Sequence, residues 1–134
     1  MKVLVVDDEQ LILDFVRRFL RRKGFDVAVS PCGEDALKKL ESFVPDVLIL
    51  DIGMNGMDGY ELARRVKAKP ELADVPIVFL SGFDVDTDNA RSFLSGGSVY
   101  IRKPIRGEVL VEALQAVANT GKPESVQTGG GSDA

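Results

Sequence analysis

The chain has 134 residues, with 45% apolar and 28% charged side chains, which suits one globular domain with a substantial core. It contains no histidine, so chemistry that needs a histidine base, nucleophile or metal ligand is excluded within it. The single cysteine, Cys32, excludes an internal disulfide and makes a cytoplasmic location the default expectation. The net charge of −4 argues against binding of nucleic acid. The apolar runs are too short to span a bilayer, so we expect no membrane-spanning segment.

Short apolar runs rich in β-branched residues alternate along the chain with segments of helical periodicity. The runs predict strands near residues 2–6, 26–29, 47–50, 77–80 and 99–101. The first helical pattern is an apolar stripe from Leu11 to Leu20, followed by a basic turn and Gly24, which is typical of a helix C-terminus. Further patterns predict helices over residues 34–42, 58–69, 86–95 and 108–118.

The resulting order is a strand followed by a helix, five times over. Right-handed crossovers then favour a doubly wound α/β fold, in which one parallel sheet is covered by helices on both faces. A closed eight-fold barrel needs about 250 residues, so we expect an open sheet. The end of the chain is rich in glycine and small polar residues, so we predict a domain over residues 1–119 and a flexible tail over residues 120–134.

Four short polar segments directly follow predicted strands. Asp7 and Asp8 follow the first strand, Asp51 the third, Ser81 the fourth and Lys103 the fifth. Since ligands of open parallel sheets bind beyond the carboxyl ends of the strands, we expect these side chains to converge at one edge. Together, the carboxylates, the hydroxyl and the ammonium group can hold a divalent cation and a phosphoryl group.

The acidic side chains at this edge repel one another, and an uncompensated cluster would raise some of their pKa values. A hard divalent cation relieves the repulsion, and Mg²⁺ commonly takes one or two carboxylates together with a phosphate. Lys103 can pair with Asp51 at rest and then with a phosphoryl oxygen, while Ser81 can donate a hydrogen bond to another oxygen. The Lys103-Pro104 bond can be cis, which would fix the lysine backbone.

These segments carry a family resemblance. The sequences Val-Val-Asp-Asp-Glu at 5–9, Leu-Asp-Ile-Gly-Met-Asn-Gly-Met-Asp-Gly at 50–59, Leu-Ser-Gly at 80–82 and Tyr-Ile-Arg-Lys-Pro at 100–104 resemble the receiver domain of bacterial two-component response regulators. Each segment alone is weakly specific, but all of them in this order and spacing are highly specific. The resemblance covers about residues 2–119 and implies the flavodoxin-like strand order 2-1-3-4-5.

The resemblance implies a signalling phosphoacceptor with slow self-dephosphorylation rather than a metabolic enzyme. Asp51 would accept a phosphoryl group from a phosphohistidine on a histidine kinase or a histidine phosphotransfer protein. Asp8, Asp51 and the backbone carbonyl of Gly53 would bind Mg²⁺ directly, and Asp7 would act through a water molecule.

The resemblance also implies a switch. Ser81 would be the switch hydroxyl, Lys103 the phosphate partner and Tyr100 the aromatic that turns inward. The face formed by the fourth helix, the fifth strand and the fifth helix would then change and bind a downstream protein target. A homodimer on activation is compatible with the resemblance, although no residue pattern supports one.

Three positions near the proposed acceptor are informative. Asn55 stands where the family usually has proline, although Asn55-Gly56 still tolerates the positive φ of a tight turn. Gly53 offers no side chain beside the site, so we expect freer access of water to the acceptor. Ser81 replaces the common threonine and keeps the hydroxyl.

Taken singly, most of these residues also have ordinary structural explanations. Asp7 or Asp8 would be a helix N-cap, Asp51 a turn residue and Lys103 a solvated lysine, but one site explains all of them together. For Tyr100, simple packing stays an alternative to the switch role. A basic cluster at the end of the first helix either complements the helix dipole or contacts a partner; it comprises Arg17, Arg18, Arg21, Arg22 and Lys23.

Other functions fit the sequence less well. A Mg²⁺-dependent aspartyl phosphohydrolase would place a second acid two residues after the nucleophile, where this chain has Gly53. A flavodoxin-like cofactor site would need a phosphate-cradling loop, whereas Asp7-Asp8-Glu9 is anionic. A degenerate receiver would not keep the acids and the lysine. We favour a stand-alone regulator over a fragment of a larger regulator or hybrid kinase.

Overall fold

The computed structural model describes residues 1–82 and 99–120, so the predicted helix over 86–95 and most of the predicted tail lie outside the described residues. The strands are β1 (Lys2–Val6), β2 (Asp26–Ser30), β3 (Val47–Asp51), β4 (Ile77–Ser81) and β5 (Val99–Arg102). The helices are α1 (Gln10–Arg22), α2 (Gly33–Lys39), α3 (Gly59–Lys67) and α5 (Gly107–Thr120). None of these helices combines the length and the apolarity needed to cross a membrane.

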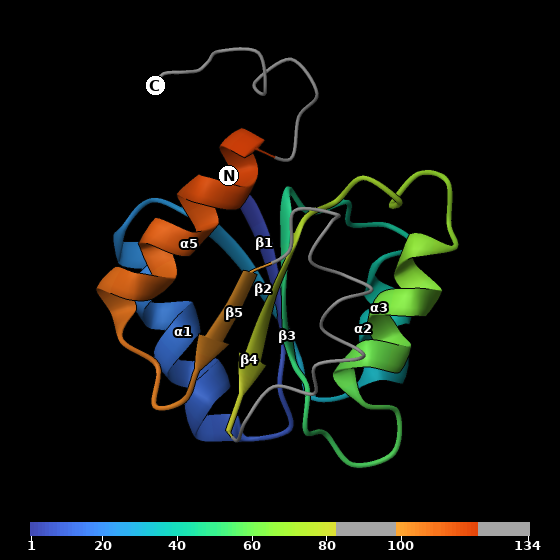
Figure 1. The fold of residues 1–134 in the computed structure, drawn as a ribbon, viewed down its shortest axis with the longest axis horizontal. Helices are drawn as coiled ribbons and strands as arrows, with labels where there is room; N and C mark the ends of the chain where they lie inside the picture. The colour runs from blue at the N-terminus through green and yellow to red at the C-terminus, as the bar shows by residue number, and fades with distance from the viewer. Residues whose placement is uncertain (83–98, 121–134) are drawn as a thin grey trace.

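The strands form one parallel sheet in the order β2-β1-β3-β4-β5, which confirms the doubly wound fold and the predicted strand order. Helices α1 and α5 cover one face of the sheet, and α2 and α3 cover the other (Figure 1). The register pairs Val6 with Leu50, Asp51 with Leu80 and Ser81 with Arg102. The carboxyl ends of four neighbouring strands are therefore level with one another, as the site requires.

Alternate residues of the central strands enter two separate cores. Leu48 and Leu50 of β3 pack with Phe79 of β4 on the side of α2 and α3. Val47 and Ile49 of β3 join the core on the side of α1 and α5. Every residue of β3 and β4 is buried, as expected for parallel strands that are covered on both faces. This buried centre supports Asp51 and Ser81, the last residues of β3 and β4.

Strands β2 to β5 each extend one residue beyond the predicted limits. The added residue of β3 is Asp51, which still pairs with Leu80, and that of β4 is Ser81. Sheet pairing thus continues into the polar residues at the strand ends, where hydrophobicity stops but backbone hydrogen bonding does not. The polar groups are consequently held by the sheet itself rather than by flexible loops.

The apolar stripe of α1 is divided between the core and the surface. Leu13, Val16 and Leu20 are buried against the sheet. In contrast, Leu11 is 82% exposed and Phe15 is 42% exposed. The stripe is wider than the sheet can cover, so part of it forms an apolar strip on the outer face of the helix.

Helix α2 ends at Lys39, three residues before its predicted end, because the backbone then tightens into three-residue turns. The N–H of Glu41 donates to the carbonyl of Lys38, and the N–H of Ser42 donates to the carbonyl of Lys39.

Helix α3 begins after its N-cap residue, Asp58. The Asp58 side chain accepts a hydrogen bond from the Glu61 N–H at 2.9 Å.

Candidate functional site

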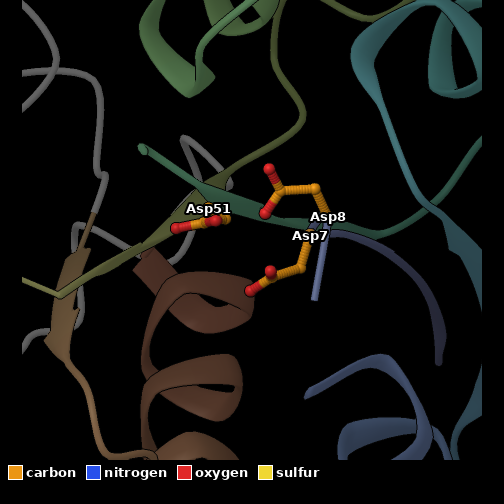
Figure 2. Close-up of side chains that lie close together, drawn as sticks. All are labelled: Asp7, Asp8 and Asp51. Carbon is orange, nitrogen blue, oxygen red and sulfur yellow. The ribbon is translucent and has the colours of Figure 1, made fainter. Parts of the chain in front are cut away.

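Asp7, Asp8 and Asp51, hereafter the acidic trio, lie together at the carboxyl ends of β1 and β3 (Figure 2). One carboxylate oxygen from each lies within 4.8 Å of those of the other two. Asp7 is fully buried and Asp51 is 4% exposed, whereas Asp8 is exposed. The trio therefore has two buried carboxylates and one that faces solvent.

Asp7 is fixed by the start of α1 without capping that helix. Its Oδ1 accepts a hydrogen bond from the Glu9 backbone N–H at 2.9 Å. The N-cap residue of α1 is Glu9, and no side chain caps this helix. The alternative that Asp7 or Asp8 is the N-cap is therefore wrong, because the helix begins one residue further along the chain.

The loop after β3 holds the other two carboxylates. The backbone N–H of Asn55 donates to Asp8 Oδ2 at 3.1 Å, and that of Gly53 donates to Asp51 Oδ1 at 3.3 Å. Gly56 has a φ of +73°, as expected for the predicted tight turn. One short loop thus orients acids that come from two different strands.

Lys103 supplies positive charge to this site. Its Nζ lies 3.0 Å from Asp7 Oδ2, 3.2 Å from Glu9 Oε2 and 3.4 Å from Asp51 Oδ1. The side chain is only 14% exposed, so it is not a solvated surface lysine. Its backbone N–H donates to the Ser81 carbonyl at 2.7 Å, and the Lys103-Pro104 bond is cis. Burial lowers the pKa of Lys103, but the carboxylates of Asp7, Asp51 and Glu9 outweigh it and raise the pKa overall.

Glu9 also lies in the site, although no role for it could be predicted from the sequence. The signal was its place directly after Asp7 and Asp8 in the first polar segment. Its carboxylate is free of a capping role at the start of α1 and reaches Lys103 instead. Glu9 is 61% exposed, so its attraction for Lys103 is weakened by solvent.

Burial raises the pKa of Asp7 from its ordinary 3.8 to about 6. The Glu9 N–H opposes this rise, the charge of Asp51 adds to it, and Lys103 opposes it. The Glu9 N–H and Lys103 thus offset only part of the cost of burying the ionised Asp7 carboxylate. A cation bound nearby would offset the rest of this cost.

Replacing Asp7 by asparagine should remove a pH-dependent destabilisation. Between about pH 4 and about pH 6 the native state keeps the Asp7 proton that the unfolded state releases, so the stability falls as the pH rises through this window. We expect the stability of Asp7→Asn, relative to the unsubstituted chain, to rise by about 3 kcal/mol across the window and then stay level. Denaturant unfolding without Mg²⁺ measures this difference, and a difference independent of pH would contradict the role of Asp7.

Ser81 and Tyr100 lie on the neighbouring strands β4 and β5. Ser81 is 2% exposed and ends β4 beside Asp51 of β3. Tyr100 is half-buried, and its ring stacks on Phe79 with the centroids 4.9 Å apart. This contact is what the packing alternative predicts for Tyr100, and it is equally compatible with a ring held in an inward position.

The donor set of the acidic trio fits a hard divalent cation. All ligand atoms are carboxylate oxygens, which Mg²⁺ prefers, and exposed Asp8 gives the ion a path from solvent. Burial, the main cause of the raised pKa of Asp7, deprives its ionised carboxylate of hydration, which a bound cation would replace. Gly53 is exposed beside Asp51, where its carbonyl can serve as a further oxygen ligand.

The sequence matches the response regulator receiver domain family over residues 3–115. The chain belongs to this family. Among curated proteins, this receiver is 37% identical to the heme response regulator HssR of Staphylococcus aureus over 114 residues, which are 85% of the chain and 50% of HssR. The receiver thus spans about half the length of the curated relatives it matches.

Solved receiver structures share the fold. The chemotaxis protein CheY4 of Vibrio cholerae is 30% identical with a TM-score of 0.80, over 87% of this chain and 97% of that one. The N-terminal domain of a receiver protein from Methanoculleus marisnigri is 34% identical with a TM-score of 0.72, over 85% and 93% of the two chains. The family and fold implied by the sequence segments are thereby confirmed.

Proposed function

We propose that this receiver accepts a phosphoryl group on Asp51 from a phosphohistidine of a histidine kinase or phosphotransfer protein, with Mg²⁺ at the acidic trio. The observation that carries the proposal is the placement of Asp51 between Asp8, Asp7 and Lys103. A buried carboxylate with a lysine on one side and a cation site on the other can attack phosphorus while added negative charge is neutralised.

The transfer is a substitution at phosphorus. A bond forms from an Asp51 carboxylate oxygen to phosphorus as the phosphorus–nitrogen bond of the donor breaks, and the electron pair stays on the imidazole. Such transition states need mainly alignment and charge neutralisation. Lys103 lies 3.4 Å from Asp51 Oδ1 and supplies one positive charge. Asp8, Asp51 and the Gly53 carbonyl would hold Mg²⁺, which would supply further positive charge when bound.

Water later hydrolyses the resulting acyl phosphate, which returns Asp51 to its carboxylate form. Gly53, two residues after Asp51, has no side chain to restrict the approach of this water. The same position lacks the acid that an aspartyl phosphohydrolase would use, so turnover of external phosphate esters is the less favoured function. In this proposal the chain is a signalling phosphoacceptor rather than an enzyme, with the slow self-dephosphorylation that the family resemblance implies.

Phosphorylation is read out through β4 and β5 in this proposal. The Ser81 hydroxyl moves to bond a phosphoryl oxygen, and Tyr100 changes its packing on the neighbouring strand. Ser81 is buried at the end of β4, and its carbonyl accepts from the Lys103 N–H at 2.7 Å, so the sensor and the counter-charge are linked directly. The face that includes β5 and α5 then binds a downstream protein or a second copy.

The phosphodonor docks on α1 in this proposal. A shallow groove there joins apolar and basic side chains of the outer face; it is lined by Leu11, Asp14, Phe15, Arg18, Phe19 and Arg22. Leu11 and Phe15 are exposed in this groove. A helix face that contacted only solvent would not need exposed apolar side chains, so their presence favours contact with a partner. Other members of the basic cluster have structural partners, since Arg17 pairs with Asp14 and Arg21 donates to the Val27 carbonyl.

Replacing Asp8 by alanine tests the cation site. Because Asp8 contributes one carboxylate of the trio, we expect Asp8→Ala to weaken Mg²⁺ binding at least about tenfold. Titration calorimetry measures the affinity, and Asp74→Ala, which removes an exposed acid at the opposite edge of the sheet, serves as the control. Unchanged affinity in Asp8→Ala would reject its role as a ligand.

Binding of a phosphoryl mimic tests the whole site. Beryllium fluoride should bind the unsubstituted chain only when Mg²⁺ is present, which amide spectra would show as shifts around Asp51, Ser81 and Lys103. Binding that is independent of Mg²⁺, or shifts confined to other parts of the sheet, would overturn the proposed function.

A further inference from the structure

Asp8 is held by the backbone of a residue that is far away in the sequence. The N–H of Asn55 donates to Asp8 Oδ2 at 3.1 Å, across 47 residues of chain. Asp8 is the exposed member of the acidic trio, so its side chain would otherwise exchange among rotamers in water. A hydrogen bond from an N–H to a carboxylate is charge-assisted and therefore among the stronger ones.

We propose that Asn55, through its main-chain N–H, is a positioning residue for divalent cation binding. The inference rests on the proposed function and deepens it. The N–H holds the Asp8 carboxylate beside Asp51 before the cation arrives, so less side-chain freedom is lost on binding. A carboxylate has room for about four hydrogen-bonding or ligand contacts, so the bond to Oδ2 leaves it able to bind a cation.

The identity of residue 55 decides whether this bond can form. Every residue except proline carries a backbone N–H. The following Gly56 adopts a φ of +73°, which glycine accommodates without strain. Asn55 is exposed, so its side chain is not required for packing. The effect is therefore carried by the main chain, and proline at this position would abolish it.

A pair of variants separates the N–H from the side chain. Asn55→Pro removes the donor, and Asn55→Ala keeps it while removing the amide side chain. By calorimetric titration of the full chain with Mg²⁺ alone, we expect Asn55→Pro to lose affinity about tenfold, as for other groups that orient a metal ligand. Asn55→Ala should keep the affinity of the unsubstituted chain.

An amide-exchange measurement makes the test independent of whether Asn55→Pro folds well. In the unsubstituted chain without Mg²⁺, the Asn55 amide should exchange more slowly than it does in Asp8→Ala, which removes its acceptor. Equal exchange rates in the two proteins would overturn the positioning role, because the hydrogen bond would then be absent in solution.

The outcomes distinguish this inference from the proposed function. If the unsubstituted chain binds no Mg²⁺, both are overturned. If it binds Mg²⁺ and a folded Asn55→Pro binds equally well or more tightly, only the role of Asn55 is overturned. Equal losses in Asn55→Pro and Asn55→Ala would assign the effect to the side chain and also overturn it.

Discussion

Asp51→Ala is expected to abolish phosphorylation by acetyl phosphate in the presence of Mg²⁺. The variant has no carboxylate oxygen to form the bond to phosphorus, and the neighbouring acids cannot replace it. Asp7 is fully buried and paired with Lys103, and Asp8 is held by the Asn55 N–H. Intact-mass measurement after incubation reports the fraction of the chain that carries a phosphoryl group.

Two further variants show that the loss reflects chemistry rather than unfolding. Asp51→Asn has nearly the same shape as the native side chain and should load no better than Asp51→Ala. Asp74→Ala removes the same charge from an exposed position before β4, at the edge of the sheet opposite the site, and should load normally. Full loading of a folded Asp51→Asn protein would exclude Asp51 as the acceptor.

Lys103→Gln should slow loading by about 100-fold, because removing one donor aimed at developing negative charge costs about 10²–10³ in rate. Lys103 is the counter-charge for Asp7, Glu9 and Asp51, and its Nζ lies within 3.4 Å of an oxygen of each. Its raised pKa keeps it protonated at neutral pH, so the charge is present throughout an ordinary assay. The rate of acetyl phosphate loading measures the effect.

Lys38→Gln is the matched control for this variant. Lys38 is exposed at the end of α2, so its substitution changes the net charge equally without touching the site. Its loading rate should equal that of the unsubstituted chain. A similar slowing in both variants would show that overall charge, rather than the position of Lys103, governs the reaction.

The convergence of the site residues could be predicted from the sequence, because buried parallel strands bring the residues at their carboxyl ends to one edge of the sheet. The apolar runs before Asp7, Asp51 and Ser81 were sufficient for this inference. The strand limits were one residue short because the predictions were based on hydrophobicity, whereas backbone pairing continues through Asp51 and Ser81.

The features that the sequence did not reveal depend on contacts between distant segments. The bond from the Asn55 N–H to Asp8 depends on the path of a turn, which residue types alone do not specify. The contact of Glu9 with Lys103 depends on where α1 begins. The division of the α1 stripe, with Leu11 exposed, depends on how much of the helix the sheet can cover.

The most direct test of the central claim is chemical identification of the phosphorylated residue. Borohydride reduces an aspartyl phosphate to homoserine but does not reduce a serine phosphate. After loading with acetyl phosphate and Mg²⁺, peptide mass spectrometry should find homoserine at position 51. Homoserine at position 7 or 8 instead, or a loaded chain that yields none, would contradict the assignment of Asp51 as the phosphoacceptor.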